Sequence, residues 1–271
     1  MKSLKNWLLV VSVLSCFGCS SPVHEDGRGC AFVSDSIQYR VEFMSEGCVR
    51  ILSFPEGDTL VTKRLVVDSQ KSAFKDYKWK DTGQQLIFST RELSVAFDKE
   101  DAAFTFQEVS TGKLLLKEKE AKKARHFKRS VAGGEQCLEV TQRFVPTDDE
   151  AIYGLGQYQN GIMNYRGKSV LLLQANMDIV NPFLISTNGY GILWDNYSST
   201  KFEDTKEGYS FTSEVGDASD YYFVYGKNMD EVVAGYRELT GDVPMFGKWV
   251  YGFWQSKERY KSFNELKAVV K

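Results

Sequence analysis

Apolar side chains recur at every second position along much of this chain, and this spacing limits the fold more than any other feature of the sequence. The alternation covers residues 37–43, resumes at 49–53, and returns at 93–97 and 104–106. Successive side chains of a β-strand point to opposite faces, so each stretch has one buried and one solvated face. Short polar runs such as Ser45-Glu46-Gly47 separate the stretches, as turns do. We therefore predict a mainly β chain with an antiparallel β-sandwich.

The composition is that of an ordinary folded protein and excludes several classes of function. The chain has 271 residues, 42% hydrophobic and 26% charged, with a formal net charge of −2. A general nucleic-acid binder would carry a basic surplus, so we expect no nucleic-acid partner. With 2 His and 5 Cys, and with no phosphate-binding glycine motif, we expect no metal and no cofactor. The 14% of aromatic residues suits β-rich cores and sugar-binding clefts alike.

The first 19 residues have the layout of a bacterial lipoprotein signal peptide. Lys2 and Lys5 precede a short apolar run over 7–14, which two cysteines close. The run is too short to span a bilayer, which needs about 20 apolar residues. We expect lipid attachment at Cys16, which has the better apolar residues upstream, or at Cys19, which follows a glycine. Residues 20–33 would be a tether, and the protein would be exported to the bacterial cell envelope; a plain secretory signal is the alternative.

The remaining cysteines and the histidines carry no catalytic signal. Cys30, Cys48 and Cys137 are odd in number and show no paired spacing, which favours a structural role. His24 lies in the presumed tether and His126 in a basic run over 117–129, and we expect both to be inert surface residues. The basic run itself is typical of a solvated hairpin or loop.

The end of the chain differs in character from the strands before it. Residues 34–241 form the predicted sandwich domain, whose last segment is a helix opened by Asn228 and Glu231 as a capping box. Residues 249–254 are continuously apolar, as in a strand buried on both faces, and Ser262 with Glu265 opens another helix. We interpret 242–271 as the first strand, loop and helix of an incomplete (β/α)8 barrel, so that the chain is the front piece of a longer protein.

The chain resembles glycoside hydrolase family 31, the α-glucosidases and α-xylosidases, from about residue 153 to 271 and more loosely back to 34. The segments that carry the likeness are, in order, Tyr153-Gly154-Leu155-Gly156, Asn181-Pro182-Phe183-Leu184-Ile185-Ser186, Gly189-Tyr190-Gly191, Trp194-Asp195-Asn196, Thr240-Gly241, Trp249 and Gly252-Phe253-Trp254-Gln255-Ser256-Lys257-Glu258-Arg259-Tyr260. Each is weak alone, but their order and spacing are specific. The resemblance implies a sandwich similar to galactose mutarotases in front of a (β/α)8 barrel.

The resemblance also implies a retaining α-glycosidase that acts on α-linked oligosaccharides, an α-xylosidase or an α-glucosidase. Retention needs two carboxyl groups about 5 to 5.5 Å apart. In the family both lie on later barrel strands, so we assign no catalytic residue here and expect the nucleophile and the acid/base residue beyond Lys271. The chain alone should hydrolyse nothing.

Three residues are expected to contact the sugar by resemblance to the family. Asp178, in Asn176-Met177-Asp178, matches a loop that lines the sugar subsite; stabilising a turn is its alternative role. Glu258 and Tyr260 follow the first barrel strand, on the face where barrel active sites are built. Many α-glucosidases have an aromatic residue where Glu258 stands, so the segment Gln255 to Tyr260 is more similar to bacterial α-xylosidases.

Two other classes of function compete with this interpretation. A stand-alone carbohydrate-binding sandwich is the first, but such a module has no need of the strand and capped helix after Gly241. A mutarotase-like enzyme is the second, and it would need a general acid and base on the sheet, for which His24 and His126 are poorly placed.

Overall fold

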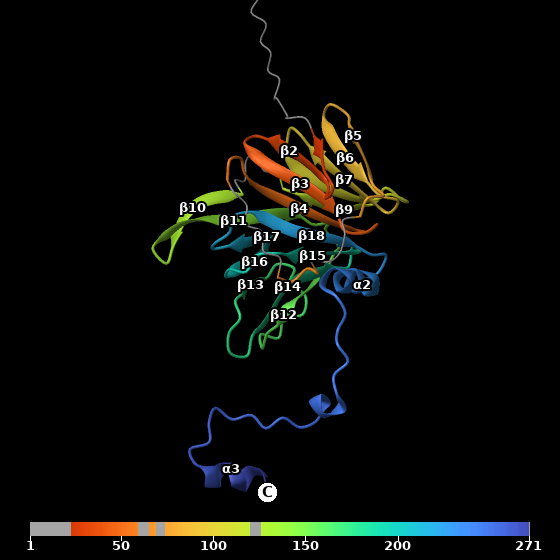
Figure 1. Ribbon diagram of the computed structural model, residues 1–271. Helices are drawn as coiled ribbons and strands as arrows, with labels where there is room; N and C mark the ends of the chain where they lie inside the picture. The colour runs from red at the N-terminus through yellow and green to blue at the C-terminus, as the bar shows by residue number, and fades with distance from the viewer. Residues whose placement is uncertain (1–22, 59–64, 69–73, 120–125, 271) are drawn as a thin grey trace, which may run out of the picture. The chain divides into compact units, whose positions relative to one another are not determined.

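The computed structural model describes residues 23–58, 65–68, 74–119 and 126–270, and it divides into two compact units after Thr240. The first unit contains two antiparallel sheets, in agreement with the predicted sandwich (Figure 1). The division falls next to the domain boundary that the sequence placed after Gly241. The predicted signal peptide, with Cys16 and Cys19, lies outside the described residues.

The eight-stranded sheet, called sheet A, runs in the order β1-β2-β3-β4-β18-β15-β14-β12. Its strands are β1 (His24–Glu25), β2 (Cys30–Ser34), β3 (Ile37–Phe43), β4 (Cys48–Pro55), β12 (Ile152–Gln157), β14 (Ile179–Ser186), β15 (Tyr190–Trp194) and β18 (Ser219–Tyr225). The alternation over 37–43 and 49–53 forms β3 and β4, paired from Ile37↔Pro55 to Phe43↔Val49, so this sequence-based prediction is confirmed.

The ten-stranded sheet, called sheet B, runs in the order β13-β16-β17-β11-β9-β8-β7-β6-β5, with β10 paired to β11. Its strands are β5 (Lys78–Asp81), β6 (Gln85–Ser89), β7 (Leu93–Asp98), β8 (Ala103–Glu108), β9 (Leu114–Glu118), β10 (Phe127–Ala132), β11 (Glu135–Val145), β13 (Ser169–Leu172), β16 (Thr200–Thr205) and β17 (Gly208–Ser213). The predicted hairpin over 93–106 is β7 and β8, and Asp98 closes its turn by accepting the Glu100 amide at 2.9 Å.

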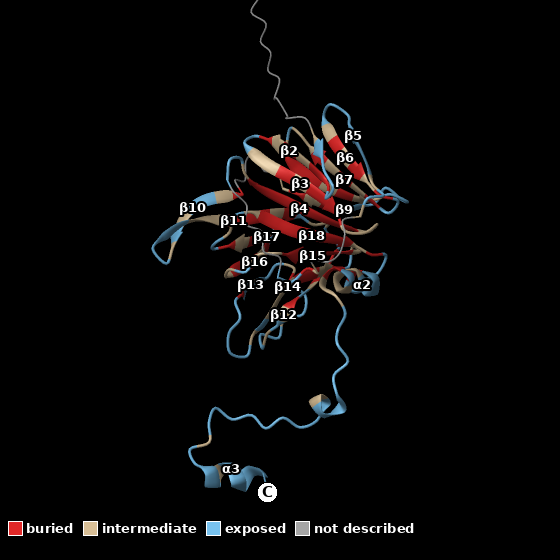
Figure 2. Cartoon of the chain, viewed as in Figure 1, coloured by how far each residue is buried: buried red, intermediate tan, exposed pale blue. Residues whose placement is uncertain are grey.

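Many of the buried residues in the core between the two sheets are aromatic. Figure 2 shows the buried positions in red along the strands of both sheets. Phe106 of sheet B stacks on Phe223 of sheet A with ring centroids 4.2 Å apart, and Trp194 stacks on Phe211 at 5.5 Å. Burying side chains of this size contributes about 2 to 3 kcal/mol each. The aromatic pairs therefore hold the sheets together.

A buried carboxylate also joins the two sheets. Glu118 Oε1 accepts hydrogen bonds from Tyr221 Oη and Gln142 Nε2, each at 2.8 Å, and Oε2 accepts the Phe104 amide at 2.8 Å. Burial raises the pKa of Glu118 to about 7, although the donors oppose this effect. Gln142 extends the network by accepting from Ser219 at 2.9 Å. The sandwich therefore has a polar connection inside an otherwise aromatic core.

Helix α2 (Met229–Thr240) covers a second, smaller apolar cluster on sheet A. The Glu231 amide donates to Asn228 Oδ1 at 3.0 Å, and Glu231 Oε2 accepts the Lys227 amide at 3.0 Å. The first bond satisfies an amide that the first helical turn leaves without a partner, and the second ties the Glu231 side chain back to the backbone just before the helix. The predicted capping box is thus confirmed.

Three sequence-based predictions about surface segments were wrong in part. The presumed tether over 20–33 contains β1 and most of β2, and Cys30 is buried in the core. His126 is only 7% exposed, because it directly precedes β10 and its ring bonds to the backbone of β11. Within the basic run, Glu118 is buried as described above, whereas Lys128 and Arg129 are exposed. No disulfide joins the cysteines among the described residues.

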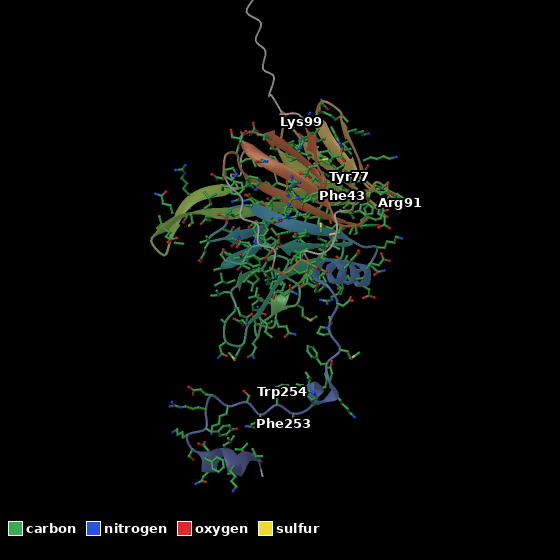
Figure 3. The ribbon with its side chains drawn as sticks, viewed as in Figure 1. Phe43, Tyr77, Arg91, Lys99, Phe253 and Trp254 are labelled. Carbon is green, nitrogen blue, oxygen red and sulfur yellow. The ribbon has the colours of Figure 1, made fainter. Side chains whose placement is uncertain are left out.

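The second unit, residues 241–271, contains the 3-10 helix η1 (Lys248–Tyr251) and the helix α3 (Phe263–Val270). The predicted helix is confirmed, and its capping bond runs from the Glu265 amide to Ser262 Oγ at 3.2 Å. The predicted first barrel strand over 249–254 is not formed, and Trp249 is exposed. Phe253 and Trp254 are exposed as well (Figure 3). A strand needs neighbours that pair with its backbone groups, and no described residue pairs with this segment.

Of the helices in the part of the chain that the structure describes, none combines the length and the apolar character needed to cross a bilayer.

Candidate functional site

Two glycines let β12 approach β14 closely at the base of the loop that carries Asp178. Gly154 and Gly156 have φ of +97° and +115°, which strongly disfavours any residue with a side chain. A Cβ at Gly156 would lie 2.0 Å from the Ile179 carbonyl oxygen, and one at Gly154 would lie 2.4 Å from that of Phe183. These two glycines therefore mark a close approach of the β12 and β14 backbones.

Between these glycines the pairing of β12 with β14 shifts register. Leu155 sits at the shift with φ of +66° and is fully buried. Such a bulge increases the local twist of the strand and bends its path. The first residue of β14, Ile179, pairs with Gln157, so the bulge lies close to the Asp178 turn.

The amide side chain of Gln174 clamps the turn that presents Asp178. Gln174 Nε2 donates to the Asp178 carbonyl oxygen at 2.7 Å, and Gln174 Oε1 accepts the Val180 amide at 3.1 Å. The Asp178 amide closes the turn on the Ala175 carbonyl at 3.3 Å. The Gln174 side chain therefore makes the hydrogen bonds with the Asp178 and Val180 backbone that a neighbouring strand would otherwise make. Sequence reasoning missed Gln174, because the short spacing 174–180 was its only signal.

The Asp178 carboxylate is half-buried at the end of this clamped turn, just before β14. Within the described residues, its oxygens make no hydrogen bond or ion pair, and the bonds that hold the turn come from Gln174 and the backbone. The pKa of the nearby Tyr158 is raised to about 12, first by burial and then by the charges of Tyr165 and Asp178. The turn thus holds a carboxylate whose acceptor capacity is open to a ligand.

The middle of β14 is anchored by helix α2. Tyr236 stacks on Phe183 with ring centroids 4.3 Å apart, and its hydroxyl donates to Asn181 Oδ1 at 3.4 Å. These contacts give the Asn181-Pro182-Phe183 segment a structural role. The strand that leads away from Asp178 is therefore fixed both by its pairing with β12 and by the helix.

A pocket of about 310 Å³ adjoins the base of the Asp178 loop. Its lining includes Leu172, Gln174 and Val180, together with the segment from Leu193 to Thr200. Tyr197 Oη accepts the Leu65 amide at 2.8 Å there, and burial raises the pKa of Tyr197 to about 12. The lining is mostly apolar, so the pocket suits a hydrophobic ligand face better than a charge.

The Trp194-Asp195-Asn196 motif serves the fold at this pocket. Trp194 is fully buried and donates from Nε1 to Ser213 Oγ at 2.9 Å. Asn196 donates to the Val215 carbonyl at 3.0 Å and accepts the Ser198 amide at 2.8 Å. The motif therefore contributes to the lining of the pocket through structural contacts.

Glu258 and Tyr260 belong to the second unit, whereas Asp178 belongs to the first. Glu258 is exposed, and Lys257 Nζ lies 4.9 Å above the centre of the Tyr260 ring. Lys257 also forms an ion pair with Glu265, which joins the loop to the start of α3. Sugar contact by Asp178, Glu258 and Tyr260 stays a prediction.

The described residues contain no group of three or more His, Cys, Asp or Glu side chains arranged to hold a metal ion.

Comparison with known proteins identifies relatives of this chain. The model of the glycosyl hydrolase 31 N-terminal galactose mutarotase-like domain matches residues 38–203. An α-xylosidase from Saccharolobus solfataricus is 37% identical over 87% of this chain and 33% of that protein. The chain thus spans about a third of the length of this curated relative.

Solved structures show the same fold. A glycoside hydrolase family 31 α-xylosidase from Xanthomonas citri superposes with a TM-score of 0.78, at 23% identity, over 92% of this chain and 43% of that one. A family 31 dextranase from Flavobacterium johnsoniae, complexed with isomaltotriose, gives a TM-score of 0.70 at 23% identity over 87% and 30% of the two chains. The chain belongs to the family of glycosyl hydrolase 31 N-terminal, galactose mutarotase-like domains.

Proposed function

We propose that this chain is the N-terminal portion of an exported retaining α-glycosidase that acts on α-linked oligosaccharides, with α-xylosidase as the favoured specificity. Family membership and the 37% identity to an α-xylosidase support the proposal. α-Glucosidase is the alternative specificity, since a bacterial α-glucosidase is 26% identical over 88% of the chain.

The observation that carries a role in substrate binding is the clamped turn of Asp178. A carboxylate accepts hydrogen bonds from two hydroxyl groups of one sugar ring and need not change its protonation to do so. The Gln174 bonds fix the turn before the sugar arrives, which lowers the entropy lost on binding. Within this proposal the sandwich orients the substrate, and no catalytic residue is assigned to this chain.

The test uses the polypeptide encoded by the whole open reading frame and p-nitrophenyl α-xyloside. We expect Asp178→Asn to lower kcat/KM by a factor of roughly 5 to 150, the range for losing the partner of a polar group. Asp217→Asn, which changes an exposed carboxylate between β17 and β18, is the matched control and should leave kcat/KM unchanged.

Different results separate the parts of the proposal. Unchanged kinetics for Asp178→Asn would remove Asp178 from the sugar site but leave the activity standing. Turnover of the α-glucoside in preference to the α-xyloside would shift the specificity. Binding of oligosaccharide with no turnover of either would favour the stand-alone carbohydrate-binding module instead.

We also propose that the protein is attached to the cell envelope through a lipid on Cys16 or Cys19. The support is the order of charged, apolar and cysteine-containing segments in residues 1–19. Metabolic labelling with radioactive palmitate should label the wild-type protein in bacterial cells. Loss of label in Cys16→Ser or in Cys19→Ser identifies the modified cysteine, and label retained in the double variant contradicts the proposal.

A further inference from the structure

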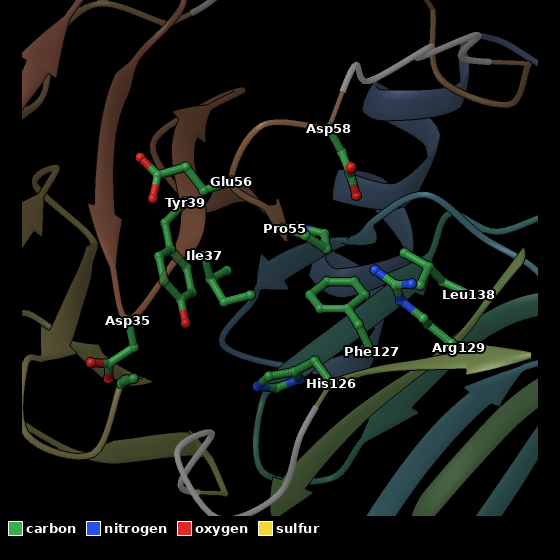
Figure 4. A pocket seen from close by; sticks show the side chains of 11 residues that line it. Asp35, Ile37, Tyr39, Pro55, Glu56, Asp58, His126, Phe127, Arg129 and Leu138 are labelled. Atoms are coloured by element: carbon green, nitrogen blue, oxygen red, sulfur yellow. The ribbon is translucent and has the colours of Figure 1, made fainter.

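A second pocket, of about 730 Å³, lies at the base of the β10–β11 hairpin in the first unit (Figure 4). Its lining comes from the turn after β2, from β3, the end of β4, the turn between β7 and β8, the start of β10 and the middle of β11. It shares no residue with the Asp178 turn or the pocket beside it. The volume is within the range of small-molecule sites, about 300 to 1,000 Å³. None of its side chains has a role in the function proposed above.

His126 is a buried hydrogen-bond acceptor in the wall of this pocket. Its side chain is more than nine-tenths buried, and Nδ1–H donates to the Thr141 carbonyl oxygen at 3.0 Å. Burial lowers the pKa of His126 to about 4, so the ring is neutral at pH 7 and Nε2 carries a lone pair. In the part of the chain that the structure describes, Nε2 has no hydrogen-bond partner. A ligand at this wall must therefore offer a donor.

The rim of the pocket adds groups of both polarities. Glu56 and Asp58 follow β4 and are exposed, so their carboxylates supply further acceptors. Arg129 of β10 is exposed, and its planar guanidinium supplies several N–H donors. Among the described residues, Glu56, Asp58 and Arg129 form no ion pair. Half-buried Phe127 adds an apolar ring between Arg129 and His126 (Figure 4).

This set of groups selects one chemical class of ligand. An anion would meet the carboxylates of Asp35, Glu56 and Asp58, and an organic cation would meet the guanidinium of Arg129. Sugar hydroxyls donate to His126 and the carboxylates and also accept from Arg129, while the C–H face of the ring covers Phe127. We propose that this pocket is a second carbohydrate site, which binds one neutral sugar unit away from the Asp178 turn.

The test titrates the 271-residue chain with maltotriose as the probe and follows the imidazole nitrogen signals of His126 by NMR. We expect saturable binding and a shift of the Nε2 signal. Glu56→Gln and Arg129→Ala should each weaken binding by roughly tenfold, the scale of one lost hydrogen bond. Lys128→Ala, a neighbouring exposed cation on β10 outside the pocket lining, is the matched control and should bind like the wild type.

Three outcomes would overturn the proposal. These are the absence of saturable maltotriose binding, an affinity that Glu56→Gln and Arg129→Ala leave unchanged, and tighter binding of spermidine or trigalacturonate than of maltotriose. Asp178→Asn separates this site from the one proposed above, because it should leave the His126 signal and the affinity at this pocket unaffected. The assay needs no turnover, so its result is independent of the glycosidase activity.

Discussion

The sandwich and the segment 241–271 place the same kinds of residue in opposite environments. Trp194 in β15 is fully buried between the sheets, whereas Trp254 is 64% exposed and Trp249 is 74% exposed. Both segments are apolar enough for a buried strand, but only β15 has a neighbour on each side, β14 and β18. The difference shows that apolar composition makes a strand possible and that backbone pairing decides whether it forms.

The largest contrast is expected from removing one tryptophan in each region. Trp194→Ala deletes a stacked ring and the donor to Ser213, and it should lower the free energy of unfolding of the chain by about 3 to 5 kcal/mol. Trp254→Ala should change it by less than about 0.5 kcal/mol, as exposed substitutions do. Urea unfolding monitored by circular dichroism measures the free energy of unfolding of both variants. Equal losses of stability would contradict the difference between the sandwich and the segment 241–271.

A second contrast concerns the pH dependence of two carboxylates. The pKa of Glu118 is raised to about 7 by burial, so the folded state holds this proton more tightly than the unfolded chain, whose pKa is near 4.5. The stabilisation is therefore complete below pH 4.5 and is lost as the pH rises towards 7. Relative to Glu118→Gln, the wild type should be more stable at pH 5 than at pH 8 by up to roughly 3 kcal/mol.

Glu265 of the second unit is the control for this pH experiment. Its pKa is lowered, first by the hydrogen bond from Lys257 and then by that from the Lys261 amide, and the residue is half-buried at the start of α3. Glu265→Gln should leave the difference between pH 5 and pH 8 as it is in the wild type. Urea midpoints at the two pH values provide the measurement. A Glu118→Gln protein with the wild-type difference would show that Glu118 titrates normally.

The smallest contrast is expected between the two capping boxes. Asn228→Ala removes the side-chain acceptor at the start of α2, which packs on sheet A, and should destabilise the sandwich by about 1 kcal/mol. Ser262→Ala makes the same change at α3, which has no buried residue, and should leave the unfolding midpoint unchanged. A common shift in both variants would mean that α3 unfolds together with the sandwich.

Much of the sandwich could be predicted because the features that define it are local. The two-residue period indicated β3, β4, β7 and β8, and the pairs Asn228–Glu231 and Ser262–Glu265 marked two helix starts within four residues of sequence. The glycines of β12 were also recognisable, since a positive φ and a close approach both exclude side chains. The family segments placed Asp178 in a loop but said nothing about the side chain that holds that loop.

The amino-acid sequence by itself determined the alternating strands β3, β4, β7 and β8 and the starts of helices α2 and α3, because period and capping act between near neighbours. Only the tertiary structure decided that Glu118 joins two sheets, that Gln174 clamps the Asp178 turn and that His126 is buried against Thr141. It also decided that residues 249–254 form no strand. Each of these outcomes depends on which distant segment supplies the hydrogen-bond partner, and strand pairing sets that partner over separations that no local pattern encodes.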